Sequence, residues 1–129
     1  MVAADLDEDG RIDLFVANDM TPDYLYLNQG GFKFVENGLT AGVSSNATGA
    51  SQAGMGTACG DLDGDGLPDL AVTNYYNEST TFFRNLGGGL FGDETAAVGL
   101  AAPSRYLLGF GIAFLDADND GRLDLMTAN

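Results

Sequence analysis

An acidic ten-residue pattern occurs three times in this chain of 129 residues, at an almost constant spacing. The copies are DLDEDGRIDL at 5–14, DLDGDGLPDL at 61–70 and DADNDGRLDL at 116–125. Their first aspartates are 56 and then 55 residues apart, so each copy belongs to a structural unit that repeats along the chain. A fold made of similar successive units is therefore the strongest constraint that the sequence supplies.

Each copy has aspartate at positions 1, 3, 5 and 9 and glycine at position 6. This pattern is typical of a calcium loop, because carboxylates supply hard anionic oxygens and the glycine lets the backbone turn sharply beneath them. An EF-hand would need glutamate at position 12, which here holds Val16, Val72 and Thr127. A cage of several carboxylates also favours calcium over magnesium, which prefers a smaller and more rigid shell.

The composition excludes several classes of function. The net charge is −14, but twelve of the nineteen acidic residues are the aspartates of the three loops, and three bound divalent cations would bring the charge to −8. The five cations are scattered singly, so nothing favours nucleic acid or an anionic membrane as partner. There is no histidine, and the one cysteine, Cys59, is expected to be buried and inert. Any metal ion must therefore be held by oxygen ligands.

Short β-prone segments surround every loop. VAAD, GMGTACGD and GFGIAFLD precede the loops, and LFVAN, LAVTN and LMTAN follow them, so each loop is predicted to connect a β-hairpin. Segments 23–36 and 79–94 predict a second hairpin in each unit, with Gly30-Gly31 and Gly87-Gly88-Gly89 at the turns. The aromatic residues of these segments are expected in strands, most of them packed between units: Tyr24, Tyr26, Phe32, Phe34, Phe82, Phe83 and Phe91.

Four short strands in about 55 residues predict an all-β chain, a partial β-propeller of four-stranded antiparallel blades. The predicted repeats are 1–53, 54–108 and the start of a third at 109–129, with blade-to-blade connections at 37–53 and 95–108. This amounts to about two blades and the first hairpin of another. A propeller closes on itself to remove its edges, so we expect the chain to be part of a longer protein that supplies the remaining blades.

These motifs resemble the FG-GAP or VCBS repeat, which includes the calcium-binding blades of integrin α-subunits. The strings FRNLGGGLFGDET and AAVGL make the chain most similar to repeats that accompany the ASPIC/UnbV domain. The resemblance implies three calcium sites, each with four aspartate side chains and the main-chain carbonyl at position 7. The implied ligands are Asp5, Asp7, Asp9, Arg11 and Asp13; Asp61, Asp63, Asp65, Leu67 and Asp69; and Asp116, Asp118, Asp120, Arg122 and Asp124. The FG and GAP strings are replaced here by GMG and GFG, so integrin-like ligand recognition does not follow.

Two functions are compatible with this pattern. The first is a calcium-stabilised structural or interaction scaffold, extracellular, periplasmic or on the cell surface, with any signal peptide upstream of this segment and a protein or carbohydrate partner that the sequence does not identify. The alternative is part of a secreted carbohydrate- or phosphate-active enzyme whose catalytic residues lie elsewhere. No nucleophile and base pair can be assembled within this segment, so we expect no catalysis here.

Overall fold

The computed structural model describes residues 1–129 and consists of two four-stranded antiparallel sheets and a separate hairpin. Blade 1 contains β1 (Val2–Ala4), β2 (Asp13–Val16), β3 (Tyr24–Asn28) and β4 (Phe34–Glu36), and blade 2 contains β5 (Gly54–Gly60), β6 (Asp69–Asn74), β7 (Thr81–Asn85) and β8 (Phe91–Asp93). The third hairpin pairs β9 (Gly111–Leu115) with β10 (Asp124–Ala128). In each blade the strands pair in chain order. The predicted all-β class, with two blades and the first hairpin of another, is confirmed.

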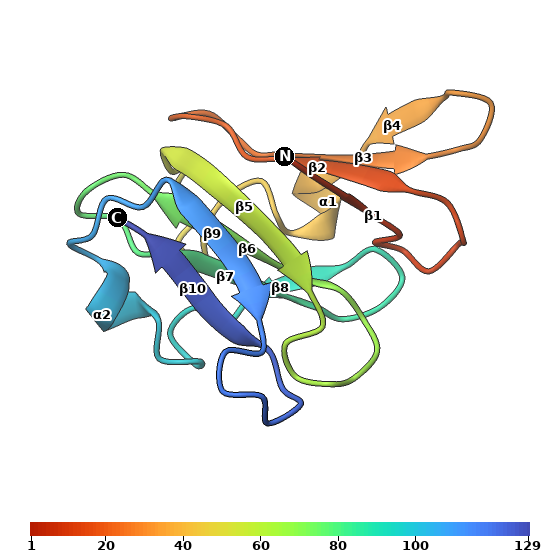
Figure 1. The fold of residues 1–129 in the computed structure, drawn as a ribbon. Coiled ribbons are helices and arrows are strands. Elements are labelled where there is room, and N and C mark those ends of the chain that lie inside the picture. Colours follow the sequence, from red (N-terminus) through yellow and green to blue (C-terminus); the bar gives the residue numbers. More distant parts are fainter.

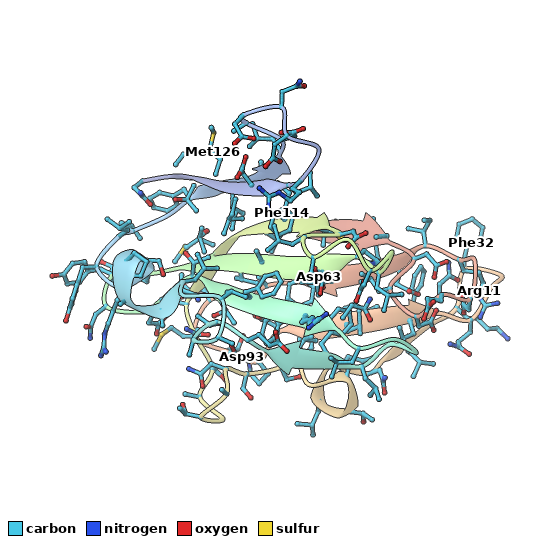
Figure 2. All side chains as sticks on the ribbon, turned by 90° about the horizontal axis from the view of Figure 1, so that it is seen from below. Arg11, Phe32, Asp63, Asp93, Phe114 and Met126 are labelled. Carbon is cyan, nitrogen blue, oxygen red and sulfur yellow. The ribbon has the colours of Figure 1, made fainter.

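Blade 2 lies between the other two units (Figure 1). Its first strand, β5, contacts β1 of blade 1 and β9 of the third hairpin. The glycines of β5 permit this close approach: a Cβ added at Gly56 would lie 2.4 Å from the carbonyl oxygen of Phe110. Phe114, on β9, lies between the hairpin and blade 2 in Figure 2.

The main hydrophobic core fills the space between blades 1 and 2. It draws on both sheets and on the connection between them: Leu6, Phe15, Leu25, Ala41, Val43, Leu70, Val72, Phe83 and Phe91. Phe15 of β2 and Phe83 of β7 meet edge to face, with ring centroids 6.5 Å apart. Every residue of β6 is buried, as expected for a strand with a sheet on either side.

Both blade-to-blade connections contain one helical turn, α1 (Gly38–Ala41) and α2 (Ala101–Ser104). The sequence shows no amphipathic period in either connection, because one turn is too short to produce one. No helix in the structure is both long and apolar enough to cross a bilayer.

The turns that close the second hairpins follow the prediction, with one exception. Gly30 and Gly31 of blade 1, and all three turn glycines of blade 2, have positive φ. Phe32, expected in a strand, instead lies in the turn with φ of 60° and a fully exposed side chain that projects from the tip of blade 1 (Figure 2). Its expected packing between blades is therefore wrong, because β4 does not begin until Phe34.

Candidate metal sites

The three acidic loops connect the strands of hairpins and share one backbone arrangement. The position-1 aspartate receives two main-chain N–H groups, from positions 5 and 6, at 2.9 to 3.1 Å in all three loops. The position-6 glycines Gly10, Gly66 and Gly121 have φ between 83° and 91°. Left-handed backbone of this kind is where glycine is favoured, so the residue at position 6 is explained by the turn itself.

Three carboxylates converge in each loop, from positions 1, 3 and 9. One oxygen from each member of a cluster lies within 4.8 Å of the others. The clusters are Asp5, Asp7 and Asp13; Asp61, Asp63 and Asp69; and Asp116, Asp118 and Asp124. Two oxygens that each lie 2.3–2.6 Å from one calcium ion can be at most about 5 Å apart, so the donor set and its spacing fit that ion.

The position-5 aspartates Asp9, Asp65 and Asp120 lie outside these clusters. In each case one oxygen accepts the main-chain N–H of position 7, at 2.9 Å. The other oxygen faces a guanidinium: Arg11 binds Asp9, Arg122 binds Asp120, and Arg84 lies 3.8 Å from Asp65. The structure thus brings together nine of the twelve aspartates, and metal ligation by position 5 and by the carbonyls of Arg11, Leu67 and Arg122 stays a prediction.

The position-9 aspartates hold two strands together. Asp13 accepts the N–H of Leu6 at 2.9 Å and that of Asn28, at the end of β3, at 2.8 Å. In blade 2, Asp69 accepts the N–H of Leu62 at 3.0 Å and that of Asn85 at 2.9 Å. Both aspartates are completely buried, so each is already a structural element of its blade.

Asp124, at position 9 of the third loop, is exposed and makes only one of these two hydrogen bonds. It accepts the N–H of Ala117 at 2.9 Å. No third strand lies beside β10 to donate the second N–H. In blades 1 and 2 the second N–H comes from the third strand of the sheet, at Asn28 and Asn85.

The pKa values show where negative charge is unfavourable. Burial raises the pKa of Asp7, and the neighbouring Asp13 raises it further. Burial also raises the pKa of Asp69, although the N–H groups of Asn85 and Leu62 act in the opposite direction. A cation placed among these groups would relieve both the desolvation of the carboxylates and their mutual repulsion.

In the second loop, unlike the first, a clustered aspartate is paired with a basic side chain from a neighbouring strand. Arg84, on β7, forms an ion pair with Asp63 and also lies 4.0 Å from Glu94. The strand registers place Leu27 of blade 1 at the position of Arg84. Arg84 was not identified as a site residue from the sequence, because only the three-dimensional pairing of β6 with β7 brings it next to the loop.

Cys59 packs against the core and is half-buried. Burial and the nearby carboxylate of Asp69 raise its pKa to about 11. Its thiol is therefore protonated at neutral pH, as expected for an inert cysteine.

The fold and the repeated loops define a class of protein, and the sequence comparisons agree with it. The profile of the FG-GAP-like repeat family matches residues 5–72 and 61–127, and the chain belongs to this family. It is also similar to cartilage acidic protein 1 from Mus musculus, at 29% identity, and from Homo sapiens, at 27% identity, in each case over 93% of this chain. The chain spans 19% of the length of these relatives.

Proposed function

We propose that this chain is a calcium-stabilised scaffold module in which each ion stabilises the hairpin that contains its acidic loop. The observation that carries the proposal is the threefold convergence of carboxylates from positions 1, 3 and 9, on loops whose backbone is the same in all three copies. Bound calcium would offset the repulsion among these groups and connect the two strands of the hairpin.

The expected stabilisation is modest at each site and adds over the sites. Extracellular calcium modules bind with dissociation constants of about 10⁻⁴ to 10⁻³ M, so about 1 mM calcium adds roughly 0.4 to 1.4 kcal/mol per site. Sites of this affinity are filled outside the cytosol, which favours an extracellular, periplasmic or cell-surface location. Cell fractionation tests this location, and recovery of the protein only from the cytosol would contradict it.

A binding role fits these sites better than catalysis. In blades 1 and 2 both oxygens of the position-9 aspartate already accept main-chain N–H groups, and the other carboxylates face the same small space. We therefore assign recognition of a protein or carbohydrate partner to other surfaces of the scaffold, and no catalytic step to the loops.

Thermal unfolding in calcium and in chelator tests the proposal. We expect the melting temperature to rise by several degrees from EGTA to 1 mM calcium, and less in 1 mM magnesium. Asp63→Asn should remove part of this rise, whereas Asp19→Asn, a change at an exposed acid outside the clusters, should leave it intact. An equal melting temperature in calcium and in chelator would refute the calcium site.

A further inference from the structure

The first acidic loop packs directly against the outer turn of the next blade. The N–H of Gly88, in the β7–β8 turn, donates to the Glu8 carboxylate at 3.4 Å. A Cβ added at Gly89 would lie only 3.1 Å from the Cβ of Asp7, one of the clustered aspartates. Gly89 also has φ of 74°, so both its backbone and its surroundings suit glycine. The two blades therefore meet at a candidate metal loop.

A buried asparagine lies at the centre of this junction. The Asn85 side-chain amide donates to the carbonyl of Leu6 in the first loop at 3.3 Å, and to that of Pro68 in its own blade at 3.1 Å. Its side-chain oxygen accepts the N–H of Gly87 at 2.9 Å. Asn85 is 1% exposed, so loss of these partners would leave buried carbonyl groups without donors.

Asn85 also completes a continuous path of hydrogen bonds between the first two loops. Asp13, in the first cluster, accepts the N–H of Leu6, and the carbonyl of Leu6 accepts from the Asn85 side chain. The main-chain N–H of Asn85 then donates to Asp69, in the second cluster. Both aspartates are fully buried, so this path is shielded from water along its length.

We propose that cation binding at the first and second loops is positively coupled through Asn85. A cation in one loop draws the carboxylates of positions 1 and 3 towards the already buried position-9 aspartate, and the path through Leu6 and Asn85 passes this ordering to the other loop. The second cation then binds to a loop whose ordering cost has already been met, which raises its affinity. This inference rests on the proposed function, because it requires the loops to bind calcium.

Blade 1 contains a matched control for Asn85. Asn28 occupies the same position on β3, and its N–H donates to Asp13 at 2.8 Å. Its side chain donates to the carbonyl of Ile12 at 2.9 Å and accepts from Gly30, both within blade 1. Asn28 therefore has the same role within its blade as Asn85 but makes no hydrogen bond to another loop.

The loop glycines give each site its own reporter for a calcium titration. The N–H of Gly10 donates to Asp5, and that of Gly66 donates to Asp61, each at 2.9 Å. Their amide NMR resonances should shift as the respective loops bind calcium. Asp63→Asn disables the second loop while it keeps an oxygen for the N–H of Asp65 and leaves Asp69 unchanged.

We expect Asp63→Asn to weaken calcium binding at the first loop, followed at Gly10, by about fivefold, the lower end of typical coupling factors. Asp7→Asn should weaken calcium binding at the second loop, followed at Gly66, by the same factor, because coupling between two binding sites is reciprocal. In an Asn85→Ala background both effects should disappear, whereas in an Asn28→Ala background they should persist. Amide hydrogen exchange in EGTA confirms that each variant is folded.

The outcomes separate this inference from the proposed function. If neither glycine resonance responds to calcium in the unmodified protein, the proposed function fails and the coupling with it. If both respond but Asp63→Asn leaves the affinity at Gly10 unchanged, calcium binding stands and the coupling is wrong. That comparison needs no change at Asn85, so it remains decisive even if Asn85→Ala does not fold.

Discussion

Blades 1 and 2 share their strand order, their strand registers and their loop geometry, but they differ in burial. In blade 2, β6 is buried throughout, and in blade 1 the corresponding β2 alternates between buried and half-buried residues. The outer strands differ more: all three residues of β4 are exposed, whereas Phe91 of β8 belongs to the core. Blade 2 has a neighbour on both sides and blade 1 has one. The sequence repeat specifies the strands and turns of a blade, and its neighbours determine how much of it is buried.

The same contrast applies to single residues at equivalent positions. Asp13 and Asp69 are buried and doubly hydrogen-bonded, while Asp124 is exposed and singly bonded. One aspartate in one motif thus occupies two different environments. Substitutions at equivalent positions can show which differences between the blades affect stability and metal binding.

The largest effect is expected for Asp69→Ala compared with Asp124→Ala in metal-free buffer. Asp69→Ala leaves the buried N–H groups of Leu62 and Asn85 without acceptors, which should lower the free energy of unfolding by about 3 kcal/mol or more. Asp124→Ala leaves one exposed N–H to water, so its cost should stay below about 1 kcal/mol. Denaturant unfolding in EGTA measures both, and equal losses would show that burial by neighbouring strands is not what distinguishes the two positions.

An intermediate effect is expected at Asp23, whose equivalent position in blade 2 holds Thr80. Burial raises the pKa of Asp23 to about 6, against the effect of a hydrogen bond from the N–H of Asn18. The native state therefore binds a proton more tightly than the unfolded chain, whose aspartates titrate near 3.9, and stability falls as the pH rises from about 4 to 6.

Asp23→Asn should remove this loss and keep the acceptor for Asn18. We expect a gain on the order of 1 kcal/mol at pH 7, allowing for the partial exposure of Asp23, and no gain at pH 4. Melting temperatures across this range provide the measurement, with Asp19→Asn as the exposed control. A gain that is the same at both pH values would mean that the charge of Asp23 is not responsible.

The smallest effect is expected from Arg84→Leu, which gives blade 2 the residue of blade 1. The guanidinium competes with a cation for Asp63, so its removal should tighten calcium binding at the second loop by about two- to fivefold, the range of an exposed ion pair. The difference should shrink at high salt. Titration followed at Gly66 measures it, with Arg105→Leu as a control far from the loops. Weaker binding in Arg84→Leu would indicate instead that Arg84 orders the loop for the metal.

Much of this architecture could be predicted because its determinants are local. Hairpin loops, glycine turns and alternating apolar strands are predicted from neighbouring residues, and the observed strands lie close to the predicted segments. The convergence of positions 1, 3 and 9 also follows from a single ten-residue pattern.

The remaining features depend on contacts between units that lie far apart in the sequence. Asn28 and Asn85 occupy equivalent positions in the sequence repeat, but only the packing of blade 2 against the first loop shows that Asn85 reaches Leu6. The repetition of asparagine at these two positions was the available signal. The position of Asp9, Asp65 and Asp120 outside the clusters was also not predicted, although it is set within each loop, where the position-5 carboxylate accepts the main-chain N–H of position 7.

The turn position at which blades 1 and 2 carry different residues has a practical consequence for protein design. Gly89 and Phe32 occupy the same position in their turns, yet Gly89 touches the preceding loop and Phe32 projects into solvent. In an artificial array that repeats blade 1, the phenylalanine of each copy would clash with the acidic loop of the preceding copy. Copies of blade 2 would place glycine and the bridging asparagine at each junction, so blade 2 is the unit to multiply.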